Sequence, residues 1–186
     1  MHSPFLTIYT PTYKRPRMLK QAIESVDRQT MRRQIEHVID EDNSQEGIAG
    51  MYRRYRAAIP SFRGEYAFFL QDDDVLEAPD SVEQVYQFAK EHNNPPVIIV
   101  RNTKGFHGLL PKNWRQPPRL GEIDFANWIV RQDVHKQMAM HYGECYEGDY
   151  AFIKAVWDAG YEFEWFDYLF SHATQIGFGK PEEEEI

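Results

Sequence analysis

The sequence predicts a single α/β domain with a mainly parallel sheet flanked by helices. Short apolar segments rich in β-forming residues alternate with longer segments whose apolar residues recur at helical spacing. Several of the short segments run directly into polar or acidic loops, and no internal repeat is present. Such alternation is typical of parallel strands joined by helices. A length of 186 residues suits one domain with a substantial core.

The first hundred residues are expected to hold four strands and three helices in strict alternation. The predicted strands are residues 5–9, 35–39, 66–70 and 97–100. Pro16 suits the first turn of the first helix. Pro60 ends the second helix. Asp80 and Glu83 have the spacing of a capping box at the start of the third helix.

The second half of the chain is less regular. Residues 103–119 are rich in glycine, proline and polar side chains, and we expect a long loop that acts as a lid. Residues 123–130 are predicted to form a strand, and residues 149–159 a helix that stops at Gly160. A last strand is expected at residues 163–165.

The charge and composition exclude several classes of protein. The formal net charge is -8, with four of the negative charges at residues 182–185, and an acidic total argues against nucleic-acid binding. No apolar run approaches the roughly 20 residues of a membrane span, and no signal peptide is evident. A single cysteine, Cys145, suits a reducing cytoplasm, and we expect it to be a buried apolar side chain.

Two of the predicted strands end in loops suited to a nucleoside. Ligands of open α/β sheets lie beyond the carboxyl ends of the strands. The first loop offers an aromatic ring for stacking on a base, and the second offers carboxylates that accept hydrogen bonds from a base or a ribose. The residues are Thr10, Pro11 and Tyr13 after the first strand, and Asp40 and Asp42 after the second.

The third strand runs into three consecutive carboxylates, Asp72, Asp73 and Asp74. Neighbouring carboxylates repel one another unless a cation offsets their charge. Hard oxygen ligands suit Mg²⁺ or Mn²⁺, which in turn bridge phosphates. The alternative is that these acids only begin a turn and cap the next helix. Because the three loops fall at one edge of the sheet, we favour a metal site.

Four groups of segments, in this order, resemble motifs of glycosyltransferase family 2. They are residues 10–16 with 22–26 and 29–30, residues 40–44, residues 64–70 with the acids that follow, and residues 147–152. The resemblance covers about residues 4–160. It implies a GT-A fold, a nucleoside-diphosphate sugar donor that is most often UDP-linked, a DxD-type metal motif and inversion at the anomeric carbon. The acceptor would be a hydroxyl of a saccharide, a lipid-linked glycan or a protein glycan.

The resemblance also implies roles for the first two loops. Pro11, Tyr13 and Asp40 would hold the nucleoside, and Arg15 would lie close by, toward the phosphates. The second loop is one residue longer than is usual in the family, which leaves Asp42 as an alternative to Asp40.

For the metal motif, the resemblance implies that Asp72 faces the ribose and diphosphate and that Asp73 binds the metal. Gln71 stands where the family often has an acid, so Asp74 is the alternative ligand. In some GT-A enzymes, which resemble one another in this respect, a histidine late in the chain completes the coordination shell of the metal. By this resemblance, His172 would be that histidine.

Asp149 would be the general base of the transfer, by the same resemblance. The alternative is that an acid following Gly148 only caps a helix. We expect one domain over residues 1–180, with a nucleotide-binding half at about 1–101 and an acceptor and catalytic half at 102–180, followed by an acidic tail at 181–186.

Two other functions remain open. A metal-dependent nucleotidyltransferase shares the layout, although it usually begins with a glycine-rich phosphate loop and residues 10–15 contain no glycine. A nucleotide-sugar or glycan-binding module without turnover is the second alternative.

Overall fold

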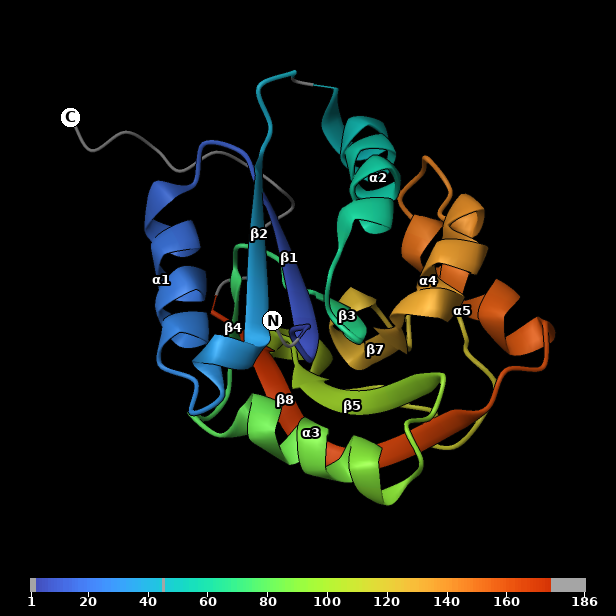
Figure 1. The fold of residues 1–186 in the computed structure, drawn as a ribbon. Helices are drawn as coiled ribbons and strands as arrows, with labels where there is room; N and C mark the ends of the chain where they lie inside the picture. Colours follow the sequence, from blue (N-terminus) through green and yellow to red (C-terminus); the bar gives the residue numbers. More distant parts are fainter. Residues whose placement is uncertain (1–2, 45, 175–186) are drawn as a thin grey trace.

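The computed structural model describes residues 3–44 and 46–174, which form one sheet with helices on both faces (Figure 1). The strands are β1 (Leu6–Thr12), β2 (Ile35–Glu41), β3 (Tyr66–Phe69), β4 (Asp74–Leu76), β5 (Val97–Thr103), β6 (Leu109–Leu110), β7 (Trp128–Arg131) and β8 (Phe163–Ala173). The α-helices are α1 (Pro16–Asp27), α2 (Gly47–Ala58), α3 (Ser81–Glu91), α4 (Gln132–Met138) and α5 (Gly148–Asp158).

The sheet has the strand order β2-β1-β3-β7-β5-β8-β4, with β6 paired to β5. Strands β1, β2, β3, β5 and β8 run in one direction, and β4, β6 and β7 run in the other. The expected α/β domain with a mainly parallel sheet is therefore confirmed. The antiparallel β7 lies between β3 and β5 and brings the two halves of the chain into one sheet.

Each face of the sheet carries its own hydrophobic core, because successive strand side chains point to opposite faces. Leu6 and Ile8 of β1 pack on the face covered by α1 and α3. Tyr9 packs on the other face, with aromatic residues of α2 and α5 and the apolar side of α4. The acidic loops at the strand ends are thus held between two rigid layers.

The four strands predicted in the first hundred residues are all present, and β1, β2 and β5 extend two or three residues further than expected. The capping box at Asp80 and Glu83 is wrong. The Asp80 carboxylate accepts a hydrogen bond from the Gln84 side chain, and Glu83 accepts one from the Thr30 hydroxyl. Both side chains that a capping box needs are therefore bound elsewhere, Asp80 by a residue of its own helix and Glu83 by a tertiary partner.

The predicted strand at residues 123–130 is wrong in its first half. Asp124 caps a 3-10 turn at Phe125–Asn127: its carboxylate accepts from the Ala126 amide, and the Asn127 side chain accepts from the Asp124 amide. The strand begins only at Trp128. Helix α4 and strand β4 were not predicted, and β8 continues well beyond residue 165.

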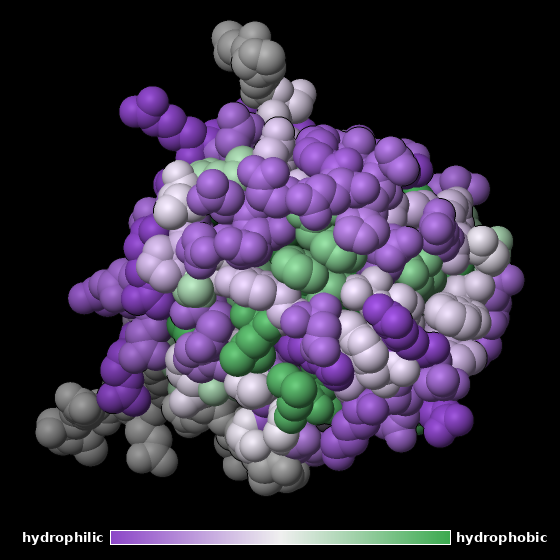
Figure 2. Space-filling model, turned by 90° about the horizontal axis from the view of Figure 1, so that it is seen from below, coloured by the Kyte–Doolittle hydropathy of each residue, from purple (hydrophilic) through white to green (hydrophobic). Residues whose placement is uncertain are grey.

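The expected lid at residues 103–119 contains a short 3-10 turn at Gly105–His107 and strand β6. Cys145 is exposed, so the expectation of a buried cysteine is wrong. The acidic tail at 181–186 and the end of the predicted domain lie outside the described residues. Hydrophilic side chains cover most of the α3 side of the molecule, with several small apolar groups among them (Figure 2). Within residues 3–44 and 46–174, no helix combines the length and apolarity that crossing a membrane requires.

Candidate functional site

The candidate site lies at the carboxyl ends of β1, β2, β3 and β5. The register of β1 with β2 places Pro11 directly opposite Asp40. Tyr13 follows β1 and is half-buried, with its ring centroid 5.4 Å from Lys14 Nζ. Thr10 is buried and pairs its hydroxyl with His37 Nε2 at 3.0 Å. Because Thr10 and Pro11 alternate along the strand, the Thr10 side chain lies on the opposite face from Pro11 and Asp40.

Asp40 and Asp42, the two candidates for binding the nucleoside, both pair with one arginine, Arg54. Arg54 Nε donates to Asp40 Oδ2 at 2.8 Å, and Arg54 Nη1 lies 3.1 Å from Asp42 Oδ1. The Tyr9 hydroxyl also donates to Asp40 Oδ2, at 2.6 Å. Burial, together with the Asp40 carboxylate, raises the pKa of Tyr9 well above its usual range, so Tyr9 stays a donor. Sequence reasoning missed Arg54, whose helical position alone does not show which acids it meets.

Arg15 lies against the carboxylates that follow β3. It forms an ion pair with Asp72, and its Nη1 atom lies 3.7 Å from Asp73 Oδ2. Asp72 and Asp73 are both almost fully buried. Burial raises the pKa of Asp72 to about 6, although the Arg15 charge opposes the shift. Arg15 thus lies beside two of the three acids, and its expected place near the nucleoside and the phosphates stays a prediction.

Asp74 is fully buried at the first position of β4, where it pairs in register with Ala173 of β8. Burial raises the pKa of Asp74 to about 8, against the opposing charge of Lys104. Asp73 Oδ1 and both carboxylate oxygens of Asp74 are buried and accept no hydrogen bond from any described residue. Buried polar atoms are usually hydrogen-bonded, so these three oxygens are exceptional in the described part of the chain.

Lys104, which sequence reasoning missed, lies immediately beyond β5. Its ammonium donates to Asp124 Oδ2 at 3.0 Å. Burial lowers the pKa of Lys104, but the charges of Asp124 and Asp74 outweigh burial and leave the pKa above its usual range. Lys104 is therefore a permanent cation in the site. Lys104 and Asp124 are twenty residues apart in a region without periodic pattern, so no local signal pointed to this pair.

Asp149 lies in the first turn of α5. Glu147 is the N-cap residue of this helix, so Asp149 is not its N-cap. The Asp149 amide donates to the Tyr52 hydroxyl at 2.8 Å, and its carboxylate accepts from the Tyr150 amide at 2.7 Å. Burial raises the pKa of Asp149 to about 7, with Asp124 adding to the shift and Lys104 opposing it. Asp149 therefore belongs to the same group of charges as Asp74, although the two acids are 75 residues apart in the chain.

The structure does not bring His172 to the aspartates. His172 Nδ1 pairs with Glu77 Oε2 at 2.5 Å. His172 is in register with Val75, the residue after Asp74, so its side chain and that of Asp74 lie on opposite faces of the sheet. Within residues 3–44 and 46–174, no three histidine, cysteine or carboxylate side chains are arranged to hold a metal ion by themselves.

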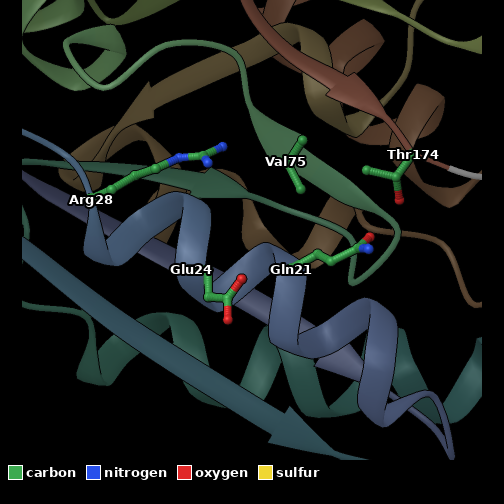
Figure 3. A pocket seen from close by; sticks show the side chains of 5 residues that line it. All are labelled: Gln21, Glu24, Arg28, Val75 and Thr174. Carbon is green, nitrogen blue, oxygen red and sulfur yellow. The ribbon is translucent and has the colours of Figure 1, made fainter.

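A hollow of about 340 Å³ lies on the Val75 side of the sheet (Figure 3). It is lined by Gln21 and Glu24 of α1, by Arg28 directly after that helix, and by Val75 and Thr174. None of the predicted site residues lines this hollow, so we assign the site from the charged groups at the strand ends and not from the hollow.

No protein-family model and no curated protein matches this chain by sequence. Solved structures match its fold. Residues 1–349 of TarS from S. aureus, in complex with UDP, superpose with a TM-score of 0.70 at 14% identity, over 90% of this chain and 60% of that one. The mannosyltransferase PcManGT from Pyrobaculum calidifontis, in complex with GDP-Man and Mn²⁺, gives 0.68 at 12% identity, over 96% and 59%. A197 from STIV gives 0.59 at 13% identity, over 87% and 81%.

This chain has a GT-A-like fold. The expected fold is thereby confirmed. The chain spans about 60% of the length of the TarS and PcManGT structures, and its identity to them is low. These likenesses establish the architecture, and the chemistry must be argued from the residues of this chain.

Proposed function

We propose that this chain is an inverting glycosyltransferase that moves a sugar from a nucleoside-diphosphate sugar, UDP-linked, to a hydroxyl of an acceptor glycan. One observation carries the proposal: Asp73 and Asp74 after β3 and Asp149 of α5 gather around one partly buried lysine, Lys104. The fold supports it, because TarS and PcManGT share this architecture and their structures hold UDP in one case and GDP-Man with Mn²⁺ in the other.

The nucleoside would lie between β1 and β2. Pro11 and Asp40 are opposite each other at the strand ends, and Tyr13 offers a ring beside them. Tyr9 and Arg54 hold Asp40 in place through Oδ2, which leaves Oδ1 to accept a hydrogen bond from a base. The residues up to about 101 would thus supply most of the donor site.

A divalent cation, Mn²⁺ or Mg²⁺, fits the carboxylates after β3. Asp73 and Asp74 present three buried oxygens without hydrogen-bond partners in the described chain, and such hard ligands suit these ions. Two carboxylates do not complete a coordination shell, which accords with an ion that takes its other ligands from substrate phosphates and water. When bound, the cation offsets the negative charge that grows on the leaving diphosphate. Arg15, already beside Asp72 and Asp73, adds a second positive charge there.

Asp149 would remove the proton from the acceptor hydroxyl as that oxygen attacks. A general base works best when its pKa is near the working pH, and burial raises the pKa of Asp149 to about 7. Tyr52 and the first turn of α5 hold the residue in position. Inversion follows when the acceptor attacks from the face opposite the diphosphate, which requires the base and the cation at separate ends of one pocket.

Calorimetry with UDP tests the donor half of the proposal. UDP should bind more tightly with Mn²⁺, and Asp73→Ala should remove most of that gain. The control Asp158→Ala, which breaks only an exposed pair with Lys154, should bind as wild type does. Equal UDP affinity with and without Mn²⁺ would remove the metal from the proposal.

A donor screen tests the catalytic half. Release of free UDP from a nucleotide sugar identifies a transferase, whereas release of pyrophosphate from a nucleoside triphosphate and a sugar phosphate identifies a nucleotidyltransferase. Asp149→Asn should keep donor binding and lower turnover by about 10²–10⁴-fold. Asp158→Asn, on the same helix, is the control. Binding without release of either product in the wild type would identify a binding module.

A further inference from the structure

The charges of the Lys104–Asp124 ion pair act on the carboxyl groups at both ends of the proposed site. The Lys104 charge interacts with Asp74 and Asp73, and Asp149 interacts with both members of the pair. The sheet register supports this placement. Thr103 of β5 is in register with His172 of β8, and the next residue of β8, Ala173, is in register with Asp74. Lys104 therefore follows β5 beside the position that Asp74 occupies across β8.

Both members of the pair are held firmly. One Asp124 oxygen accepts from the Ala126 amide at 2.9 Å, and the other accepts from the Lys104 ammonium at 3.0 Å. The Lys104 amide is also fixed by a hydrogen bond to the Gly108 carbonyl, at 3.0 Å. The side chains of Lys104 and Asp124 remain 20% and 18% exposed, so a ligand can reach them.

The pair has hydrogen-bonding capacity to spare. A lysine ammonium has three donors. Only the bond to Asp124 joins this ammonium to another side chain in the described part of the chain. Asp124 has further lone pairs that can accept from a hydroxyl. A preorganised donor and acceptor side by side suit the vicinal hydroxyls of a sugar ring.

In an inverting transfer, the anomeric carbon must lie between the leaving diphosphate and the base. A partly exposed ion pair whose charges reach both Asp74 and Asp149 is therefore suitably placed to contact the sugar. We propose that Lys104 and Asp124 form the subsite that binds the sugar ring of the donor, an inference that rests on the proposed function. The pair is a binding and positioning element and takes no part in proton transfer.

The charge around this subsite selects the class of sugar. Five carboxyl groups and two cations surround this subsite, and the cations are Arg15 and Lys104; the carboxyl groups are those of Asp72, Asp73, Asp74, Asp124 and Asp149. A cation and a diphosphate that bind together contribute little net charge, and the Lys104 charge is already matched by Asp124. A sugar that carries a carboxylate would meet repulsion here, so the subsite takes a neutral hexose and disfavours a uronic acid.

The experiment measures the affinities of UDP, UDP-glucose, UDP-N-acetylglucosamine, GDP-mannose and UDP-glucuronate by calorimetry with Mn²⁺. Lys104→Gln should weaken the best neutral donor about 10- to 100-fold and change UDP affinity less than about twofold, because one charge-assisted contact to the sugar is lost. Lys154→Gln, which alters an exposed lysine paired with Asp158, is the matched control and should change neither. Wild-type protein should bind UDP-glucose more tightly than UDP-glucuronate.

Equal losses for UDP and for the sugar donor, or no loss for either, would overturn the subsite, and preference for UDP-glucuronate would overturn the neutral-sugar assignment. If Lys104→Gln lowers the melting temperature severely, Asp124→Asn replaces it, since the amide oxygen still caps the Ala126 amide. Asp124→Asn should show the same selective loss of the sugar donor. Failure of the wild type to bind any nucleotide would refute the proposed function itself, together with the subsite.

Discussion

Gly148 is the first residue of α5, the helix that carries Asp149, and it packs closely against Gly143 and Tyr52. Alanine should not fit at this position. A Cβ atom at this position would lie 2.1 Å from the Gly143 carbonyl oxygen and 2.6 Å from Cζ of the Tyr52 ring. Contacts under 3.0 Å are essentially never seen for real Cβ atoms. Both neighbours are constrained, since one is backbone and the other is a buried ring whose hydroxyl accepts from the Asp149 amide. Gly148→Ala must therefore push the first turn of α5 away from α2.

The expected loss of folding stability follows from these contacts. Overpacking of a tight site costs about 1–3 kcal/mol, and loss of the hydrogen bond to Tyr52 adds about 1 kcal/mol. For a domain of this size, a destabilisation of about 2–4 kcal/mol lowers the melting temperature by roughly 4–16 °C. Turnover should fall further than stability, because the displaced turn carries the proposed base.

Thermal unfolding and donor turnover measure the two effects, and Gly143→Ala is the matched control. A Cβ at Gly143 would lie 3.4 Å from Cys145 Sγ and 3.6 Å from the Gly148 Cα, which is ordinary contact. We expect the control to stay within about 1 kcal/mol of wild type. If Gly148→Ala melts within about 2 °C of wild type, or if the two variants lose stability equally, the reasoning about this junction is wrong.

Two further predictions concern the charged groups. Turnover should rise with pH through about 7, because Asp149 must be ionised to accept a proton. Asp124→Asn should move this rise to lower pH, since the Asp124 charge raises the pKa of Asp149. A rise at the same pH in the variant would show that another group is titrating. Arg54→Gln should weaken UDP binding about 3- to 10-fold, because Asp40 and Asp42 lose a shared, partly buried cation. Arg53→Gln, which breaks only exposed pairs with Glu46 and Glu144, is its control, and equal effects of the two variants would contradict the assignment.

Much of the first half of the fold was predictable because its signals are local. Strands β1, β2, β3 and β5 carry apolar runs, and the helices between them carry an apolar stripe. Apolar periodicity depends on neighbouring residues alone, so it survives in the sequence without knowledge of the partner. The acids at the strand ends were found for the same reason, because parallel strands place their carboxyl ends at one edge.

Strand β4 shows where local signals end. It has three residues, begins with a carboxylate that is fully buried, and pairs with β8 almost a hundred residues later. Nothing in its hydropathy indicates a strand, because the pairing partner supplies the stability. A distant partner also removes one half of the predicted capping box, because the Glu83 carboxylate accepts a hydrogen bond from the Thr30 hydroxyl.

The sequence by itself determined the α/β class, the central strands and the acidic residues that follow them, on which the proposed site rests. Only the tertiary structure decided which charges meet: Arg54 with Asp40, Arg15 with Asp72, and Lys104 with Asp124. It also separated His172 from Asp74 by turning the two side chains to opposite faces of the sheet. The physical reason is that an ion pair depends on strand register and layer packing, which bring together residues far apart in the chain. Apolar periodicity, in contrast, depends only on neighbouring residues.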